Sequence, residues 1–117
     1  MLAKVLSAAV IGLDAFTVEV ETHLERGLPG LSIVGLPDSV VKESKDRINA
    51  AIKNSDYMFP LKRITVNLAP ADIKKEGSSY DLPIAVALLG ATGQLDIDNT
   101  KDYIILGELS LDGTVRP

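Results

Sequence analysis

Apolar and polar residues alternate along residues 16–24, which is the pattern of a strand that buries one face. Residues 63–70 alternate in the same way, while residues 3–11 and 31–36 are apolar stretches that are each followed by a glycine or a proline. The segment 26–30 contains two glycines and a proline, which predicts a loop. The pattern therefore predicts four strands before residue 71.

Residues 37–55 carry the three-to-four spacing of an amphipathic helix. Asp38 or Ser39 is expected to cap the start of this helix by accepting hydrogen bonds from amides of the first turn. Glu43 and Arg47 are four residues apart, so we expect an ion pair between them on a solvated, charged face. The face expected to be buried consists of Val41, Ser44, Ile48, Ala51 and Ile52.

Two further elements are predicted in the remaining sequence. Residues 80–94 predict a second helix, and residues 103–115 predict a hairpin that turns near Asp112 and Gly113. Strands and helices are mixed without a regular βαβ repeat, so we expect an α+β fold in which two helices cover one mixed sheet. A final strand beginning at Thr114 would be very short, and we therefore expect residues 1–117 to be one domain of a longer protein.

The composition is that of a folded domain, because 46% of the 117 residues are apolar. The 12 basic and 16 acidic residues give a net charge of −4, which disfavours binding to a phosphate backbone. The absence of cysteine excludes disulfides, thiolate metal sites and a cysteine nucleophile. The apolar stretch 5–13 is far shorter than the ~20 residues of a membrane span, so we expect a cytoplasmic protein without membrane contact.

Residues 74–83, KKEGSSYDLP, raise the question of whether this segment starts a helix or carries a nucleophile. Pro83 lacks an amide hydrogen and fits a helix only within the first turn. Ser79 or Asp81 is therefore expected to cap the helix, and the negative charge of Asp81 suits the positive end of the helix dipole.

Two other interpretations of the same segment remain open. A nucleophilic Ser78 or Ser79 would need a base, for which His23, Lys74 and Lys75 are the candidates, although we expect the lysines to be solvated and protonated. Alternatively, the helix start binds an anion, with the two lysines adding positive charge. There is no Gly-Lys pair for a nucleotide-binding loop, and the carboxylates lack metal-site spacing, so no metal site is expected.

Three stretches of the chain together resemble one protein family: GLPGLSIVGLPDSVVKES, RITVNLAPADIKKEGSSYDLPIAVALL and LGELSLDGTVRP. In consistent order over nearly the whole chain, they resemble the N-terminal domain of the ComM/YifB family of bacterial Mg-chelatase-like AAA+ ATPases. The resemblance implies an α+β fold similar to the proteolytic domain of Lon and to domain 2 of ribosomal protein S5. It also implies that an AAA+ module, which binds ATP and Mg, follows in the longer protein, and that ComM proteins act as hexameric DNA branch-migration helicases in natural transformation.

The similarity to Lon bears directly on the serines. Lon carries its nucleophilic serine in a G-P-S-A-G-like turn at a helix start, and the third position of that turn matches Ser79, the weak catalytic candidate. The two small residues that follow the serine in Lon are replaced by Tyr80 and Asp81, which place a ring and a negative charge where an oxyanion would approach. The partner lysine of Lon matches no residue of this chain. We therefore expect Ser79 to be non-catalytic.

The resemblance implies a non-enzymatic accessory domain that packs against its own AAA+ module and against neighbouring subunits of a hexamer. No cofactor is expected in this chain. Lys62, Arg63, Lys74 and Lys75 flank the strand predicted at residues 63–70 and are expected to form a basic edge, the candidate for DNA contact. The alternatives are a Lon-like serine hydrolase domain and a subunit of a metal chelatase.

Overall fold

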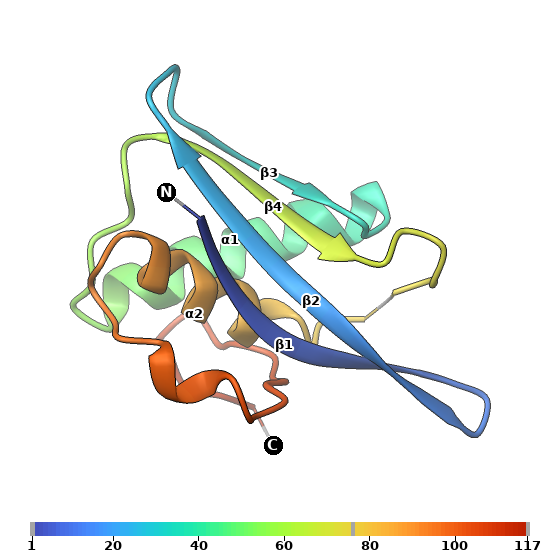
Figure 1. Ribbon diagram of the computed structural model, residues 1–117. Coiled ribbons are helices and arrows are strands. Elements are labelled where there is room, and N and C mark those ends of the chain that lie inside the picture. Colours follow the sequence, from blue (N-terminus) through green and yellow to red (C-terminus); the bar gives the residue numbers. More distant parts are fainter. Residues whose placement is uncertain (1, 76, 117) are drawn as a thin grey trace.

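A four-stranded mixed sheet forms one layer of the computed structural model, which describes residues 2–75 and 77–116 (Figure 1). The strands lie in the order β1-β2-β4-β3. They are β1 (Leu2–Ile11), β2 (Asp14–Glu25), β3 (Gly30–Val34) and β4 (Arg63–Ala69). The β1–β2 and β2–β4 pairs are antiparallel and the β3–β4 pair is parallel, so the predicted mixed sheet is confirmed.

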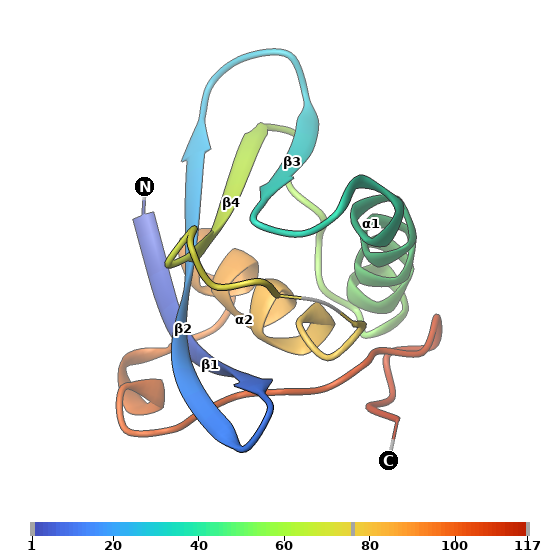
Figure 2. The same cartoon turned by 90° about the vertical axis from the view of Figure 1, so that its right-hand side faces the viewer.

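Two helices lie on the same face of this sheet (Figure 2). Helix α1 (Asp38–Asn54) connects the parallel strands β3 and β4, and helix α2 (Asp81–Ala91) packs against β1, β2 and α1. A short 3-10 helix, η1 (Asp98–Thr100), follows α2. The predicted α+β architecture is therefore confirmed.

The core lies between the sheet and the helices. Alternate residues of each strand are buried against the helices, while the opposite face of the sheet carries exposed side chains such as Lys4, Glu19 and His23. Helix α2 is apolar on nearly every side because it lies between the sheet and α1. Helix α1 buries only one stripe, formed by Ser44, Ile48, Ala51 and Ile52, with Val41 half-buried beside it. The predicted apolar face of this helix is confirmed.

The cap predicted for α1 is wrong. The residue at the N-cap position is Pro37, and no side chain accepts a hydrogen bond from the first turn. The carbonyl oxygen of Pro37 instead accepts hydrogen bonds from the amides of Val40 and Val41, both at 3.0 Å. Asp38 still contributes a favourable negative charge at the positive end of the helix.

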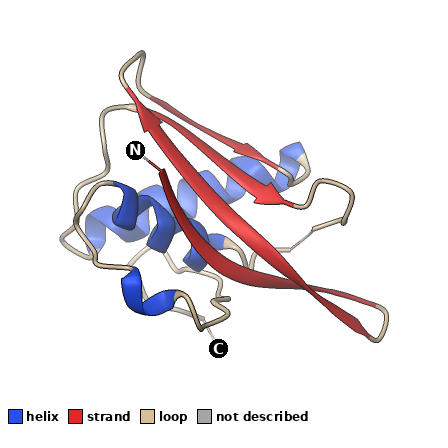
Figure 3. Ribbon diagram, in the orientation of Figure 1, coloured by secondary structure: helices blue, strands red, loops and turns tan. Residues whose placement is uncertain are grey.

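The predicted hairpin at residues 103–115 is only half present, and this region is drawn as loop in Figure 3. The turn is confirmed, since Ser110 N donates to Thr114 O at 2.8 Å. Beside the turn, Leu109 and Val115 form one antiparallel bridge and Arg116 N donates to Glu108 O at 2.9 Å. The predicted strand pairing is wrong only for the residues before Glu108, whose backbone bonds elsewhere. Ile105 N donates to Leu6 O of β1 at 2.8 Å, and Leu109 N donates to a side chain of α2.

Thr22 carries a fully buried hydroxyl that forms no hydrogen bond with a described residue. Burying a hydroxyl without a partner costs about 1–3 kcal/mol, and valine has nearly the same shape. We expect Thr22→Val to raise the free energy of unfolding by about 1 kcal/mol, as measured by urea denaturation. Thr17→Val, at an exposed position on the same strand, should change it by less than about 0.5 kcal/mol. A destabilised Thr22→Val protein would contradict the assignment.

Candidate functional site at the start of helix α2

The first turn of α2 satisfies its amides with backbone carbonyls rather than with a side-chain cap. The N-cap residue is Tyr80, and no side chain accepts a hydrogen bond from the turn. The pairs are Asp81 N to Ser78 O (3.3 Å), Leu82 N to Gly107 O (3.0 Å) and Ile84 N to Tyr80 O (3.1 Å). The fourth amide position belongs to Pro83, which has no hydrogen to donate. The predicted capping role of Ser79 and Asp81 is therefore wrong, and the amides of Asp81, Leu82 and Ile84 are already paired and not available to an anion.

The Asp81 carboxylate is instead the centre of a buried polar network, with 1% of the residue exposed. Its Oδ1 accepts hydrogen bonds from Ser44 Oγ (2.6 Å) and Arg47 Nη2 (3.1 Å), and its Oδ2 accepts from Arg47 Nε (2.6 Å) and Leu109 N (3.1 Å). These donors come from α1 and from the segment after η1, so one carboxylate connects both helices and the C-terminal segment. We call this set the Asp81 network.

The negative charge of Asp81 is balanced within the network by the guanidinium of Arg47. The side chain of Arg47 is 20% exposed and pairs with the carboxylate through two nitrogens, a geometry that favours strong pairing. The hydrogen bond to Asp81 raises the pKa of Arg47 further, so the guanidinium remains charged. Four donors occupy the two carboxylate oxygens, which leaves Asp81 unsuited to act as a general base or as a metal ligand.

Arg47 departs from the sequence-based expectation. The predicted ion pair with Glu43 is present at 3.9 Å, but Arg47 does not lie on a solvated face. Two features of the sequence point to Asp81 as the partner of Arg47. Asp81 is the only charged residue within residues 80–94, and Ser44 and Arg47 lie one helical turn apart on α1.

Ser79 is held by its backbone. Its carbonyl oxygen accepts a hydrogen bond from Gly107 N at 2.8 Å. Among the residues that the structure describes, no basic side chain forms a hydrogen bond with the Ser79 hydroxyl. The geometry therefore gives no support to activation of this serine as a nucleophile.

His23 is far from this serine. Tyr80, the neighbour of Ser79, donates a hydrogen bond from its hydroxyl to Ala8 O of β1 at 3.1 Å. His23 lies opposite Leu2 in the β1–β2 register, and Leu2 is six positions from Ala8 along β1. At the rise of a strand, that separation is about 20 Å. His23 instead lies on the open face of the sheet, 3.9 Å from Glu25.

Lys75 is buried rather than solvated, with 2% of the residue exposed. Its Nζ donates to the carbonyl oxygens of Pro70 (2.5 Å) and Ile73 (2.7 Å). Carbonyl oxygens only accept hydrogen bonds, so this amine is used as a donor to the backbone of its own loop. The expectation that Lys75 is solvated is wrong.

The four predicted DNA-binding cations do not form one basic edge. Lys62 and Arg63 stand at the start of β4, whereas Lys74 and Lys75 follow its end. Arg63 also lies 3.7 Å from Glu25. The predicted edge is wrong because the whole length of β4 separates the two pairs.

Tyr80 provides a pH-dependent test of the packing around the site. Burial raises the pKa of the Tyr80 phenol above its ordinary value of 10.0. Above that value the unfolded chain releases this proton while the folded chain keeps it, so the stabilisation present below pH 10 is lost as the pH rises. We expect the free energy of unfolding, measured by denaturation from about pH 9 to about pH 11, to fall less steeply in Tyr80→Phe. Equal slopes would contradict this.

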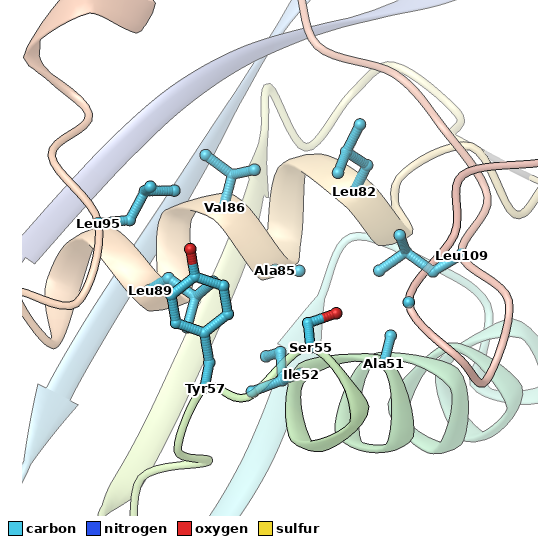
Figure 4. A pocket seen from close by; sticks show the side chains of 11 residues that line it. Ala51, Ile52, Ser55, Tyr57, Leu82, Ala85, Val86, Leu89, Leu95 and Leu109 are labelled. Atoms are coloured by element: carbon cyan, nitrogen blue, oxygen red, sulfur yellow. The ribbon is translucent and has the colours of Figure 1, made fainter.

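An apolar hollow of about 190 Å³ lies between α1, α2 and the turn after Leu109 (Figure 4). Side chains including Ile52, Ala85 and Leu89 point into it, and the hydroxyls of Ser55 and Tyr57 are the polar groups drawn there. Its 11 lining residues include no carboxylate, amine or imidazole. The hollow therefore adds no acid–base chemistry to the site.

Neither a metal site nor a membrane span is found in the described part of the chain. Residues 2–75 and 77–116 contain no cluster of three or more metal-ligating side chains. No helix within these residues has the length and apolarity needed to cross a bilayer.

Fold and site together define a small α+β domain in which a buried carboxylate network occupies the start of α2. The family model described as subunit ChlI of Mg-chelatase matches residues 20–117. The chain therefore belongs to the Mg-chelatase-like ChlI family. Its relatives identify the branch of that family.

Over 115 residues the chain is 54% identical to the uncharacterized protein YifB of Salmonella typhimurium and 51% identical to YifB of Escherichia coli. It is 49% identical to the competence protein ComM of Haemophilus influenzae over the same length. Each alignment covers 98% of this chain but only 23% of the relative, so the chain spans about a quarter of the curated relatives it matches. The resemblance to the N-terminal domain of the ComM/YifB family is confirmed.

Proposed function

We propose that the chain is a non-catalytic accessory domain of a ComM/YifB-type AAA+ ATPase in the cytoplasm. In this proposal ATP and Mg are bound by an AAA+ module outside residues 1–117. The domain packs against that module and against neighbouring subunits of a hexamer. The whole protein acts as a DNA branch-migration helicase in natural transformation, a role suggested by the 49% identity to a competence protein.

The Asp81 network is the observation that carries the non-catalytic part of the proposal. A catalytic serine at the start of α2 would need a base beside its hydroxyl and free donors for an oxyanion. The carboxylate of Asp81 instead lies next to this turn and engages Ser44, Arg47 and Leu109 N. The residue two positions after Ser79 therefore joins the elements of the fold and places a paired carboxylate beside the turn, which argues against the alternative of a Lon-like serine hydrolase.

Two measurements on the full-length protein test the proposal. Ser79→Ala should leave ATP hydrolysis and migration of a DNA four-way junction within about twofold of the unmodified protein. A serine-reactive phosphonate should leave Ser79 without added mass. Labelling of Ser79, or loss of activity in Ser79→Ala, would favour the hydrolase.

Removal of residues 1–117 tests the accessory role itself. The remaining protein should still hydrolyse ATP but should lose hexamer assembly or junction migration. Unchanged assembly and migration would contradict an accessory role.

A subunit of a metal chelatase is the second candidate, favoured by the description of the matching family. In this case the full-length protein would support insertion of Mg²⁺ into a porphyrin when combined with the other chelatase subunits. Porphyrin fluorescence distinguishes the two candidates, because junction migration requires no porphyrin.

A further inference from the structure

A groove of about 400 Å³ lies at the end of the sheet, between α1 and the loops that precede β3 and β4. Its apolar floor includes Leu31 and Phe59, and Leu61 stands at its margin. Lys45 and Lys53, two helical turns apart on α1, form its wall. We call this hollow the lysine groove.

The apolar surface continues beyond the lysine groove. A second hollow of about 610 Å³ shares Phe59, Pro60 and Leu61 with the first, so these three residues form a ridge between the two. Met58 and Leu61 are 78% and 85% exposed, although both are large apolar side chains. Neighbouring exposed apolar side chains of this kind are typical of surfaces that bind a partner.

The ridge is held in place before any partner arrives. Gln94 Oε1 accepts a hydrogen bond from Met58 N at 2.8 Å, and Gln94 Nε2 donates to Met58 O at 2.8 Å. A second contact joins the two loops, since Gly30 N donates to Lys62 O at 3.3 Å. Binding of a partner therefore costs little conformational entropy in the backbone of these loops.

The charge of the surface is opposite to that of the whole chain. Lys45, Lys53 and Lys62 line the two hollows, and Asp46 is their only carboxylate. Within the described residues, none of these lysines lies in an ion pair. The positive sign stands out in a chain of net charge −4. Electrostatic complementarity therefore selects an acidic partner.

We propose that the lysine groove and its ridge bind an acidic amphipathic peptide segment of another protein. The carboxylates of that segment pair with Lys45 and Lys53, while its apolar residues cover Leu61 and Met58. Nucleic acid fits this surface less well, because phosphates would pair with the lysines but leave the apolar ridge uncovered. The one aromatic ring of the ridge, Phe59, is partly buried against the core and is a poor platform for stacking of bases. The inference does not depend on the function of the longer protein.

A selection experiment tests the proposal with the full chain as the target. A displayed library of helical peptides places leucine or phenylalanine on one face and draws the other positions from acidic, basic and neutral residues. Acidic sequences should be enriched. Their affinity, measured by fluorescence anisotropy, should fall by about tenfold or more in Lys45→Glu/Lys53→Glu and in Leu61→Ser.

Lys42→Glu/Lys101→Glu is the matched control, because it changes the net charge equally at exposed positions outside both hollows. This variant should bind the selected peptides within about twofold of the unmodified chain. Failure to enrich any binder, enrichment of basic sequences, or equal weakening by both charge reversals would overturn the proposal. If a DNA duplex competes with the peptides and this competition is lost in Lys45→Glu/Lys53→Glu, the partner is nucleic acid and the peptide proposal is overturned. If the chain self-associates and this is lost in the same variant, the partner is a second copy of the chain and the proposal is likewise overturned.

Discussion

Replacement of Asp81 with alanine will lower the free energy of unfolding by about 3–5 kcal/mol, measured by urea denaturation. The substitution removes the carboxylate that lies 2.6 Å from Arg47 Nε, whereas the carboxylate of Glu43 lies 3.9 Å from the same guanidinium. The positive charge of Arg47 then remains mostly buried without a close partner. It also removes the acceptor of Ser44 Oγ and of Leu109 N. Removing one partner of a buried ion pair is strongly destabilising because the remaining charge is neither hydrated nor paired.

Two variants separate this charge effect from general damage. Glu43→Ala removes the exposed partner of the same guanidinium and should cost less than about 0.5 kcal/mol. Arg47→Met combined with Asp81→Leu should be more stable than Asp81→Ala, because no charge remains unpaired. If Asp81→Ala cost no more than Glu43→Ala, Asp81 would not be the centre of the network.

Replacement of Gly35 with alanine will cost about 2–4 kcal/mol in the same measurement. The backbone φ of Gly35 is +106°, a region that L side chains rarely adopt. An added Cβ would also lie 2.8 Å from Leu68 O and 3.2 Å from Lys75 Cε. The carbonyl of Leu68 belongs to β4 within the sheet, so it cannot move aside without disturbing the strand.

Gly77→Ala is the matched control for the backbone contribution. Gly77 has a φ of +89°, but an added Cβ would meet no atom within 4 Å. This variant should cost about 1–2 kcal/mol, the strain of the conformation alone. Equal losses in the two variants would mean that the contact with Leu68 contributes nothing.

The strands and the helical faces were predictable because their signals are local. Alternation over residues 16–24 marks one face of β2, and the stripe from Ser44 to Ile52 marks the buried face of α1. Both patterns depend only on neighbours within a few positions. The mixed sheet with two helices followed from these elements.

The helix caps, the terminal hairpin and the solvation of Lys75 were not predictable in this way. Each depends on which distant group competes for the same hydrogen bond. Gly107 O takes the amide of Leu82 that a capping side chain would have used. Leu6 O of β1 takes the amide of Ile105, so the segment before the turn pairs with β1 instead of lengthening the hairpin. For Lys75, two carbonyls replace water as acceptors, which no periodicity in the sequence reports.

The spacing of the Asp81 network along the chain also constrains how this domain can be made on the ribosome. Ser44 and Arg47 precede Asp81 by 37 and 34 residues, and Leu109 follows it by 28. During synthesis, α1 therefore emerges with an arginine whose countercharge has not yet left the ribosome. Even after Asp81 emerges, its last donor is still inside the ribosome. Because domains fold as units, the finished domain can form only when Leu109 has left the exit tunnel.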